Sequence, residues 1–485
     1  MEDDNNKNGF RSGALRDSPA PALAECLKAA TETRELLLKN DALAGIPDLL
    51  NRYYDFSALC LIADENTDRA AGRKVLEVLS AGGIRTAPPL IFPGKPPLHA
   101  DYRHIGAITA HIQALPNFRH VLPVAVGAGT INDLVKRAAS ELELPYLCIP
   151  TASSVDGYTS YGAALLAEGY KQTFPCSAPR ALAADTAVLR EAPAYLSSSG
   201  FGDLAGKLIA GTDWIIAERA GSLGAPGTEP IDPLAWSMTQ TGLEETLRRS
   251  VDAARGDGDA VNTLFTALSL TGFAMQHLRS SRPVSGCEHL WSHVWEMENL
   301  SAGGLPVTHG HKVAMGTLAA TAFTELVFAD AEPPRPAPAW RRPAPMERET
   351  DVRLAFGHIH PAGAGSGTGD TPLQRAVIKT ALEKLTDDRA AESLAEGLRD
   401  TWKTLREAVL ERLLPYEKLA ELFKRGGCPL SPGVINLSRT EVIATARRAQ
   451  MIRNRYTVLD LAWDLGIFET VLAKLEESPR YLRQE

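Results

Sequence analysis

The stretch HVLPVAVGAGTINDLVKRAASELELPYLCIPT, residues 120–151, decides the fold class of this 485-residue chain. Residues 120–129 form an apolar run that ends in glycines, which is typical of a buried strand. Residues 130–143 have helical apolar spacing, and residues 144–151 return to a strand-like run. Because a crossover helix joins two parallel strands, this order predicts an α/β domain with a parallel sheet.

The same alternation extends toward the N-terminus. Residues 57–64 (SALCLIAD) predict a buried strand, and residues 68–83 predict a helix closed by glycine. Residues 84–94 are extended in pattern, and residues 104–116 have helical spacing again. We therefore expect an N-terminal, Rossmann-like α/β domain that binds a dinucleotide over residues 21–190.

The rest of the chain has mainly helical patterns. Apolar residues are spaced as in a helix from about residue 22 to residue 50, and long helical patterns dominate residues 191–485, which predicts an all-α C-terminal domain. Residues 1–20 are polar and are expected to form a disordered arm. Residues 331–346 contain six prolines, which a regular helix does not tolerate, so we expect a flexible insertion over residues 330–372.

Composition excludes several classes of protein. The chain has 51 basic and 59 acidic residues, a net charge of −8, and so lacks the basic surplus of a general nucleic-acid binder. No apolar run approaches the roughly 18 residues of a membrane span, and the acidic N-terminus does not resemble a signal peptide. The six cysteines form no CxxC pair, which favours reduced thiols in a cytoplasmic protein, although Cys287 stands beside a histidine cluster.

Two polar turns follow predicted strands. Gly127, Ala128 and Gly129 lie between a strand and a helix, where backbone N–H groups can hold a phosphate. Ligands of open α/β sheets bind outside the carboxyl ends of the strands, so a second loop after the next strand strengthens the prediction of a dinucleotide. Asp64 ends another strand and could bind a ribose hydroxyl. Each feature has an alternative interpretation. The glycine turn could be a plain tight turn, the second loop could serve solubility, and Asp64 could be an ordinary acidic residue of a turn. The second loop carries Thr151, Ser153, Ser154, Thr159 and Ser160.

Histidines gather in the second half of the chain. His289 and His293 are four residues apart and share one face of a helix, and His309 follows about twenty residues later. Asp203 stands at a predicted helix start and could complete a His₂Asp set that leaves one coordination position open, as a catalytic metal requires. Neutral imidazole suits zinc and neighbouring metals. Core histidines and a helix cap at Asp203 are the alternatives.

Five motifs in order resemble the sn-glycerol-1-phosphate dehydrogenase family, most closely its bacterial AraM-like branch. This family belongs with the iron-containing alcohol dehydrogenases, glycerol dehydrogenase and dehydroquinate synthase, so the resemblance implies a dehydroquinate synthase-like fold. It covers roughly residues 40–325 and 410–470, and the tail RRAQMIRNRYTVLDLAWDLG (447–466) is similar too. The motifs are GAGTINDL (127–134), PTASSVDGYTS (150–160), GFGDLAGK (200–207), SRPVSGCEHLWSH (281–293) and THGHKVAMG (308–316).

The resemblance assigns roles to residues. It implies Asp203, His289 and His309 as metal ligands, Asp203 and His293 as catalytic residues, and Asp156 with Asp203 and His293 as substrate contacts. Ala128 stands where the family usually has a middle glycine, and the SAGGLP stretch lengthens the loop between the two histidine ligands. The implied cofactor contacts are Gly127, Ala128, Gly129, Thr130, Ile131, Thr151, Ala152, Ser153, Ser154 and Ser160.

The implied reaction is the reversible reduction of dihydroxyacetone phosphate to sn-glycerol 1-phosphate, for glycerophospholipid synthesis, in a homodimer. The resemblance implies NAD(H) or NADP(H) and one divalent metal ion, with zinc favoured over nickel or iron. Asp64 favours a free ribose 2′-hydroxyl, because its carboxylate repels a 2′-phosphate. His293 or a water molecule would relay the proton, and the candidates for the substrate phosphate are Lys207, Lys312 and His311.

Three other functions fit the same scaffold. The first is a glycerol or polyol dehydrogenase that acts on an unphosphorylated substrate. The second is a dehydroquinate-synthase-like cyclase, although such synthases have a glutamate ligand where this chain has Asp203. The third is a non-catalytic relative, which would require a broken ligand set.

Overall fold

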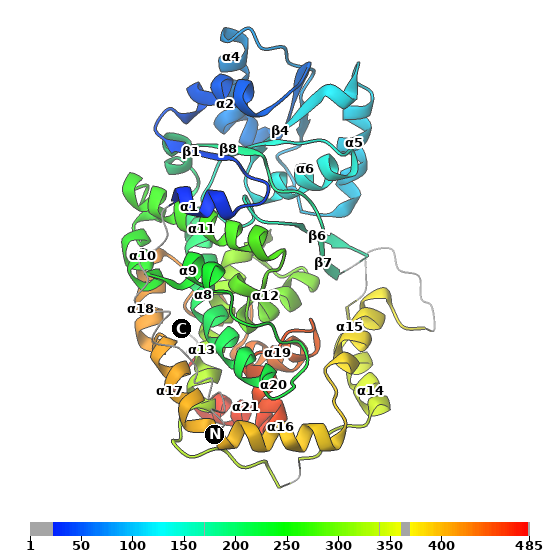
Figure 1. Cartoon of the computed structure of the whole chain (residues 1–485), viewed down its shortest axis with the longest axis vertical. Helices are drawn as coiled ribbons and strands as arrows, with labels where there is room; N and C mark the ends of the chain where they lie inside the picture. Colours follow the sequence, from blue (N-terminus) through cyan, green and yellow to red (C-terminus); the bar gives the residue numbers. More distant parts are fainter. Residues whose placement is uncertain (1–22, 169, 339, 360–368, 484–485) are drawn as a thin grey trace, which may run out of the picture.

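The chain folds into an α/β part and a helical part that lie end to end (Figure 1). A computed structural model describes residues 23–168, 170–338, 340–359 and 369–483. The arm expected over residues 1–20 lies outside the described residues. The α/β part ends after its last strand at Asp185, and a long helix begins at Ala194. We therefore propose a domain boundary near residue 190.

A six-stranded parallel sheet forms the α/β part, in the order β1-β8-β5-β4-β2-β3. The parallel sheet predicted from residues 120–151 is confirmed, and β4 and β5 from that stretch lie side by side within it. The carboxyl ends of all six strands therefore point to one edge, where the two polar turns meet. The strands are β1 Glu35–Lys39, β2 Ala58–Asp64, β3 Leu90–Phe92, β4 Val121–Gly127, β5 Leu147–Pro150 and β8 Ala181–Asp185.

Helices cover both faces of this sheet. Along β2 the side chains alternate between two apolar clusters: Leu59 and Leu61 join one, and Cys60 and Ile62 join the other. A strand that is buried on both faces is apolar at every position, which explains the continuous apolar run in the sequence. The helices of this part are α1 Leu23–Ala29, α2 Ile46–Tyr53, α3 Glu65–Thr67, α4 Arg73–Ala81, α5 Ile105–Gln113, α6 Gly129–Glu141 and α7 Thr186–Arg190.

The helical spacing read over residues 22–50 is wrong as a single helix. The segment contains α1, then the edge strand β1, then α2. Three consecutive leucines in β1 match both the strand and the helix patterns, and pairing with β8 selects the strand. The structure also contains an antiparallel hairpin of β6 (Ala163–Ala167) and β7 (Tyr170–Phe174) that was not predicted from the sequence. This hairpin lies where the α/β part meets the helices (Figure 1).

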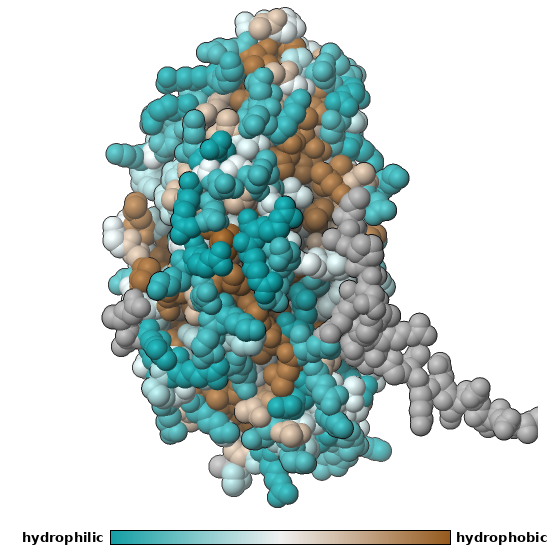
Figure 2. Space-filling view, turned by 90° about the vertical axis from the view of Figure 1, so that its left-hand side faces the viewer, coloured by the Kyte–Doolittle hydropathy of each residue, from teal (hydrophilic) through white to brown (hydrophobic). Residues whose placement is uncertain are grey.

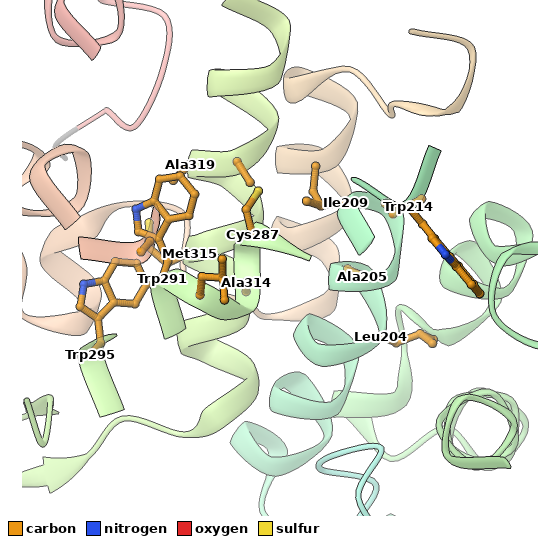
Figure 3. Packing of buried hydrophobic residues seen from close by; sticks show 14 of the residues in the cluster. Leu204, Ala205, Ile209, Trp214, Cys287, Trp291, Trp295, Ala314, Met315 and Ala319 are labelled. Carbon is orange, nitrogen blue, oxygen red and sulfur yellow. The ribbon is translucent and has the colours of Figure 1, made fainter. Parts of the chain in front are cut away.

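The helical part is built around α8, α12 and α13. Figure 3 shows Trp291 and Trp295 of α12 on one side of Met315 of α13, with Leu204 and Ile209 of α8 on the other side. All five side chains are buried. The helices are α8 Ala194–Gly221, α9 Pro233–Gln240, α10 Leu243–Ser250, α11 Gly258–Leu278, α12 Cys287–Met297, α13 His309–Val327, α14 Pro345–Phe356, α15 Pro372–Glu383, α16 Asp388–Asp400, α17 Trp402–Arg412, α18 Tyr416–Gly426, α19 Arg439–Met451, α20 Val458–Asp464 and α21 Phe468–Glu477.

Glycines allow α8 and α13 to approach each other closely. A side chain on Gly202 would overlap the backbone oxygen of Gly310, and a side chain on Gly310 would overlap the backbone oxygen of Ser199. The two helix backbones therefore touch at this crossing. Between α12 and α13, β9 (Ser301–Ala302) and β10 (Leu305–Pro306) form a small hairpin whose turn is Gly303-Gly304, both at positive φ.

The insertion expected over residues 330–372 contains a helix in its described part. Helix α14 lies within it and has a proline in its first turn, where the missing N–H is not needed. Arg342 forms an ion pair with Asp464 at 2.8 Å, and Arg348 donates to the side chain of Gln450. These contacts fix the proline-rich segment to the helices near the C-terminus.

Figure 2 shows mostly hydrophilic side chains on one face, with hydrophobic residues in a narrow band between them. Within residues 23–168, 170–338, 340–359 and 369–483, every helix is too short or too polar to span a membrane.

Candidate active site

A cleft lies between the carboxyl edge of the sheet and the helical part. Its volume is about 1270 Å³, which exceeds the roughly 300–1,000 Å³ of a typical small-molecule pocket. Asp64 and Gly129 line it from the α/β part, and His289 and His309 line it from the helical part. The cleft therefore has room for a dinucleotide and a second small molecule.

The glycine turn offers a phosphate cradle at one wall of this cleft. Strand β4 ends at Gly127, Ala128 is the N-cap without a side-chain hydrogen bond, and α6 begins at Gly129. The first N–H groups of a helix have no partner within the helix, so they can bind an anion. A Cβ on Gly129 would lie 2.7 Å from Val155, which explains the glycine there. Ala128 has an extended backbone with φ −80°, so a glycine is not needed at this position. Thr130 and Ile131 also line the cleft.

Only part of the second loop reaches the cleft. Thr151 and Ser154 line it, whereas Ala152 and Ser153 are fully buried behind it. Ser160 lines the cleft too, and its hydroxyl donates to the backbone oxygen of Gly157 at 3.0 Å. The buried pair has a packing role, because a side chain on a glycine of α8 would overlap the backbone oxygen of Ser153.

Asp64, the predicted ribose contact, ends β2 and lines the cleft. It is the N-cap of α3, and its Oδ1 accepts hydrogen bonds from the backbone of Asn66 at 2.8 Å and Thr67 at 2.9 Å. Its carboxylate also lines the cleft. Arg69 lines the same region, so one acid and one cation stand near the predicted adenosine end.

Three helices bring the predicted metal ligands together. Asp203 comes from α8, His289 from α12, and His309 is the first residue of α13. One ligand atom from each of the three lies within 4.8 Å of the other two. Nε2 of His289 is 3.5 Å from Oδ1 of Asp203, and the two imidazole rings are 5.4 Å apart between centroids.

The surroundings of the two histidines fit a metal ion. Glu288 holds Nδ1 of His289 at 2.6 Å, and Glu296 holds Nδ1 of His309 at 2.6 Å. Each carboxylate fixes the ring so that Nε2 is free to coordinate, which is the usual arrangement behind metal-bound histidines. The sequence reading missed both glutamates, although Glu296 lies seven residues after His289 and hence on the same face of α12.

Lys207 does not serve the phosphate role considered from the sequence. It is fully buried, and its Nζ lies 2.7 Å from both Oδ1 of Asp203 and Oδ2 of Asp156. Burial would raise the pKa of Asp203, but the ammonium of Lys207 and the ring of His289 hold this pKa far below its usual value. The backbone N–H of Asp156 donates to Oδ2 of Asp203 at 2.9 Å. Lys207 therefore holds both carboxylates in place and keeps Asp203 ionised.

His293 lies one helical turn after His289 and lines the cleft. The two rings are 6.1 Å apart between centroids, and Nδ1 of His293 has no hydrogen-bond partner among the described residues. Burial, followed by the positive charge of Arg453, lowers the pKa of His293 well below its usual value. The imidazole is therefore neutral and can accept a proton.

Of the two remaining phosphate candidates, only Lys312 carries a charge into the cleft. His311 also lines the cleft, but burial lowers its pKa to about 4, and its Nε2 lies 2.9 Å from the hydroxyl of Ser198. It is therefore neutral near pH 7. Lys312 lines the cleft beside Glu296, with 3.6 Å between Nζ and Oε1.

Cys287 lies behind the ligands and not in the cleft. It is fully buried, and its N–H donates to Oδ2 of Asp213 at 2.6 Å. Burial and then the charge of Glu288 raise the pKa of Asp213 to about 7, and burial raises the pKa of the Cys287 thiol. Asp213, Cys287 and Glu288 lie close enough together to form a second group of possible metal ligands. A protonated thiol is a poor ligand, so this group has a packing role. All six cysteines are buried and free of disulfides.

Known proteins resemble this chain in sequence and in fold. The family model for iron-containing alcohol dehydrogenase matches residues 37–193. Glycerol-1-phosphate dehydrogenase [NAD(P)+] from Bacillus licheniformis is 29% identical over 425 residues, which cover 86% of each chain. The enzyme of the same name from Halalkalibacterium halodurans is 35% identical over 60% of this chain and 71% of its own length. The crystal structure of a probable glycerol dehydrogenase from Sinorhizobium meliloti has a TM-score of 0.56 at 14% identity, and the match covers 92% of this chain and 98% of that one.

The structural match supports the fold alone, whereas the sequence match extends across both parts of the molecule. The expected dehydroquinate synthase-like fold, with an α/β part before a helical part, is confirmed. The family resemblance carried by the five motifs is confirmed as well. At 35% identity over 71% of a relative, with Asp203, His289 and His309 gathered beside one cleft, this chain belongs to the glycerol-1-phosphate dehydrogenase family.

Proposed function

We propose that this protein reduces dihydroxyacetone phosphate to sn-glycerol 1-phosphate with NADH or NADPH, and catalyses the reverse oxidation. One observation carries the proposal: a phosphate cradle at Gly129 lines the same cleft as His289 and His309, and the buried Asp203 lies beside these two histidines. A dinucleotide whose pyrophosphate lies at the start of α6 extends along the carboxyl edge of the sheet. The ligand group lies across the cleft, where a nicotinamide and a small ketone would meet.

The bound groups supply the chemistry that side chains cannot: the reduced nicotinamide gives a hydride, and the divalent ion stabilises negative charge on the substrate oxygen. The chain supplies orientation and proton transfer. Asp203 and the two histidines are the proposed ligands. Lys207 holds Asp156 and Asp203 in register at 2.7 Å from each, so Asp156 is fixed to accept a hydrogen bond from a substrate hydroxyl.

His293 is the proposed proton carrier. In the oxidation, its neutral ring accepts the proton of the C2 hydroxyl, and in the reduction it returns that proton to the oxygen. Its position one turn after His289 places it beside the ligand group. Its burial keeps the ring unprotonated until a substrate proton arrives.

We propose zinc as the metal ion. Two imidazoles and one carboxylate, with a position left for substrate, form the ligand set of many catalytic zinc sites. Nickel and iron bind the same donors, so metal content after growth and after reconstitution tests this choice. A homodimer and a cytoplasmic location complete the proposal, and they rest on the family resemblance and on the free, buried cysteines.

The deciding assay follows NADH or NADPH oxidation with dihydroxyacetone phosphate and, in parallel, with dihydroxyacetone. Protein stripped with a chelator and reloaded with zinc, nickel or iron should reduce the phosphate ester faster, and the product should be the sn-1 phosphate. Stripped protein without added metal should be inactive. Better turnover of dihydroxyacetone would instead identify a glycerol or polyol dehydrogenase.

Asp64→Asn should shift coenzyme preference toward NADPH. The substitution removes the negative charge that repels a 2′-phosphate, and Arg69 nearby can then pair with that phosphate. We expect the ratio of kcat/KM for NADPH to kcat/KM for NADH to rise about tenfold, which corresponds to about 1.4 kcal/mol. Steady-state kinetics with both coenzymes measures the ratio.

Asparagine is chosen because its side-chain oxygen can still cap α3, where Oδ1 of Asp64 accepts from Asn66 and Thr67. Glu77→Gln, on the exposed surface of α4, is the matched control for loss of one negative charge. An unchanged coenzyme ratio in Asp64→Asn would show that this carboxylate does not face the ribose.

A further inference from the structure

The cleft continues past the ligand group to three cationic side chains. We infer that Lys171, Lys312 and Arg453 form the subsite for the phosphate group of the substrate. The inference rests on the proposed function and names the part of the cleft that would select a phosphorylated substrate. All three side chains line the cleft that holds His289 and His309.

Arg453 is the strongest element of this subsite. Its guanidinium has no hydrogen bond or ion pair within the described residues, although it lies in a largely buried position in the loop between α19 and α20. Its backbone has φ +62°, a left-handed conformation that is uncommon for residues other than glycine. A guanidinium stays charged at all ordinary pH values, and an unpaired buried charge is costly. An anionic ligand in the cleft would supply the missing partner.

Lys171 and Lys312 share one acidic partner. Nζ of Lys171 lies 2.7 Å from Oε2 of Glu296, and Nζ of Lys312 lies 3.6 Å from Oε1. Glu296 is therefore the shared ion-pair partner of two lysines, and the charge of Arg453 acts on it without a direct ion pair. A phosphate monoester carries about −1.5 to −2 charges near pH 7. A phosphate at this place would give Arg453 a direct partner and each of the two lysines a second one.

The position of the subsite suits a short substrate. Lys312 lies three residues after His309 on α13, and Glu296 lies three residues after His293 on α12. Lys312 therefore lies about one helical turn, roughly 5 Å along the axis of α13, beyond His309. A three-carbon phosphate ester can span this distance with its ketone beside the ligand group.

The two parts of the molecule both contribute. Lys171 belongs to β7 of the hairpin at the junction, whereas Lys312 and Arg453 belong to the helical part (Figure 1). The side chain of Lys171 is only 17% exposed. A phosphate held by all three would bridge the α/β part and the helical part, so substrate binding would also fix their relative position.

Arg453→Gln in the full-length, metal-loaded protein tests the inference. We expect the ratio of kcat/KM for dihydroxyacetone phosphate to that for dihydroxyacetone to fall about 10- to 100-fold, the range for losing one charged hydrogen-bonding partner. Inorganic phosphate should inhibit the wild type competitively against the phosphate ester and should inhibit the variant much less. Arg453→Lys should recover part of the ratio.

Arg389→Gln, on the exposed surface of α16, is the control for loss of one positive charge and should leave both substrates unaffected. Lys171→Gln provides a second variant in case Arg453→Gln does not fold, and the same ratio should fall. An unchanged ratio in folded Arg453→Gln and Lys171→Gln would overturn the subsite. If the wild type itself reduces neither ketone, the proposed function fails, and titration of the wild type and Arg453→Gln with inorganic phosphate then decides the subsite on its own.

Discussion

Asp203→Asn is expected to abolish metal binding and, with it, ketone reduction. Asparagine has the same shape, and its oxygen can still accept the hydrogen bond from the backbone of Asp156, but it lacks the negative charge that a divalent ion requires. The variant also leaves Lys207 with a single carboxylate partner beside the site. Even groups behind metal ligands change affinity about 10- to 100-fold, so loss of a ligand should lower kcat/KM by more than about 100-fold.

Metal content per chain after dialysis against zinc, together with kcat/KM for dihydroxyacetone phosphate, measures this effect. Asp464→Asn is the matched control, because Asp464 is also a buried acid with a cationic partner, Arg342, and neither residue lines the cleft. This control should lose some thermal stability and keep its metal. A folded Asp203→Asn protein with one bound zinc would contradict the ligand assignment.

The strands that the sequence predicted are those with long apolar runs. Strands could be predicted within residues 57–64 and 120–129, because β2 and β4 are buried on both faces and end at an acidic or a glycine turn. Strand β8, with the sequence ALAAD, could not be predicted, because alanine favours a helix at least as much as a buried strand. Its place between β1 and β5 is decided by partners distant in sequence.

Some residues of the candidate site could likewise be predicted from the sequence, and others could not. His289 and His293 stand out because their four-residue spacing places them on one face of α12, and Asp203 stands out as a lone acid on the otherwise apolar α8. Lys207 also stands out, but its partner Asp156 lies on another element, so its burial between two carboxylates could not be read from the sequence. Lys171 comes from a hairpin and Arg453 from a distant loop, and only the packing of the two parts brings them to the cleft.

Gly310→Ala is expected to disrupt the crossing of α8 and α13 and to weaken the metal site. The new methyl group would overlap the backbone oxygen of Ser199, and a backbone atom cannot rotate away as a side chain can. Gly310 directly follows His309, and Gly202, which touches Gly310, directly precedes Asp203. Separating the helices therefore separates two proposed ligands. Overpacking of this kind costs about 1–3 kcal/mol or more.

Urea unfolding gives the loss of stability, and zinc titration of the folded variant gives the loss of affinity. Gly106→Ala is the matched control, because Gly106 lies in α5 with open space where a side chain would point. Alanine favours the helix, so this variant should be as stable as the wild type or more stable. If Gly310→Ala bound zinc and unfolded like the wild type, the backbone contact between α8 and α13 would not hold the ligands in place. A stability loss together with weaker zinc binding would instead show that the position of the ligands depends on this helix crossing.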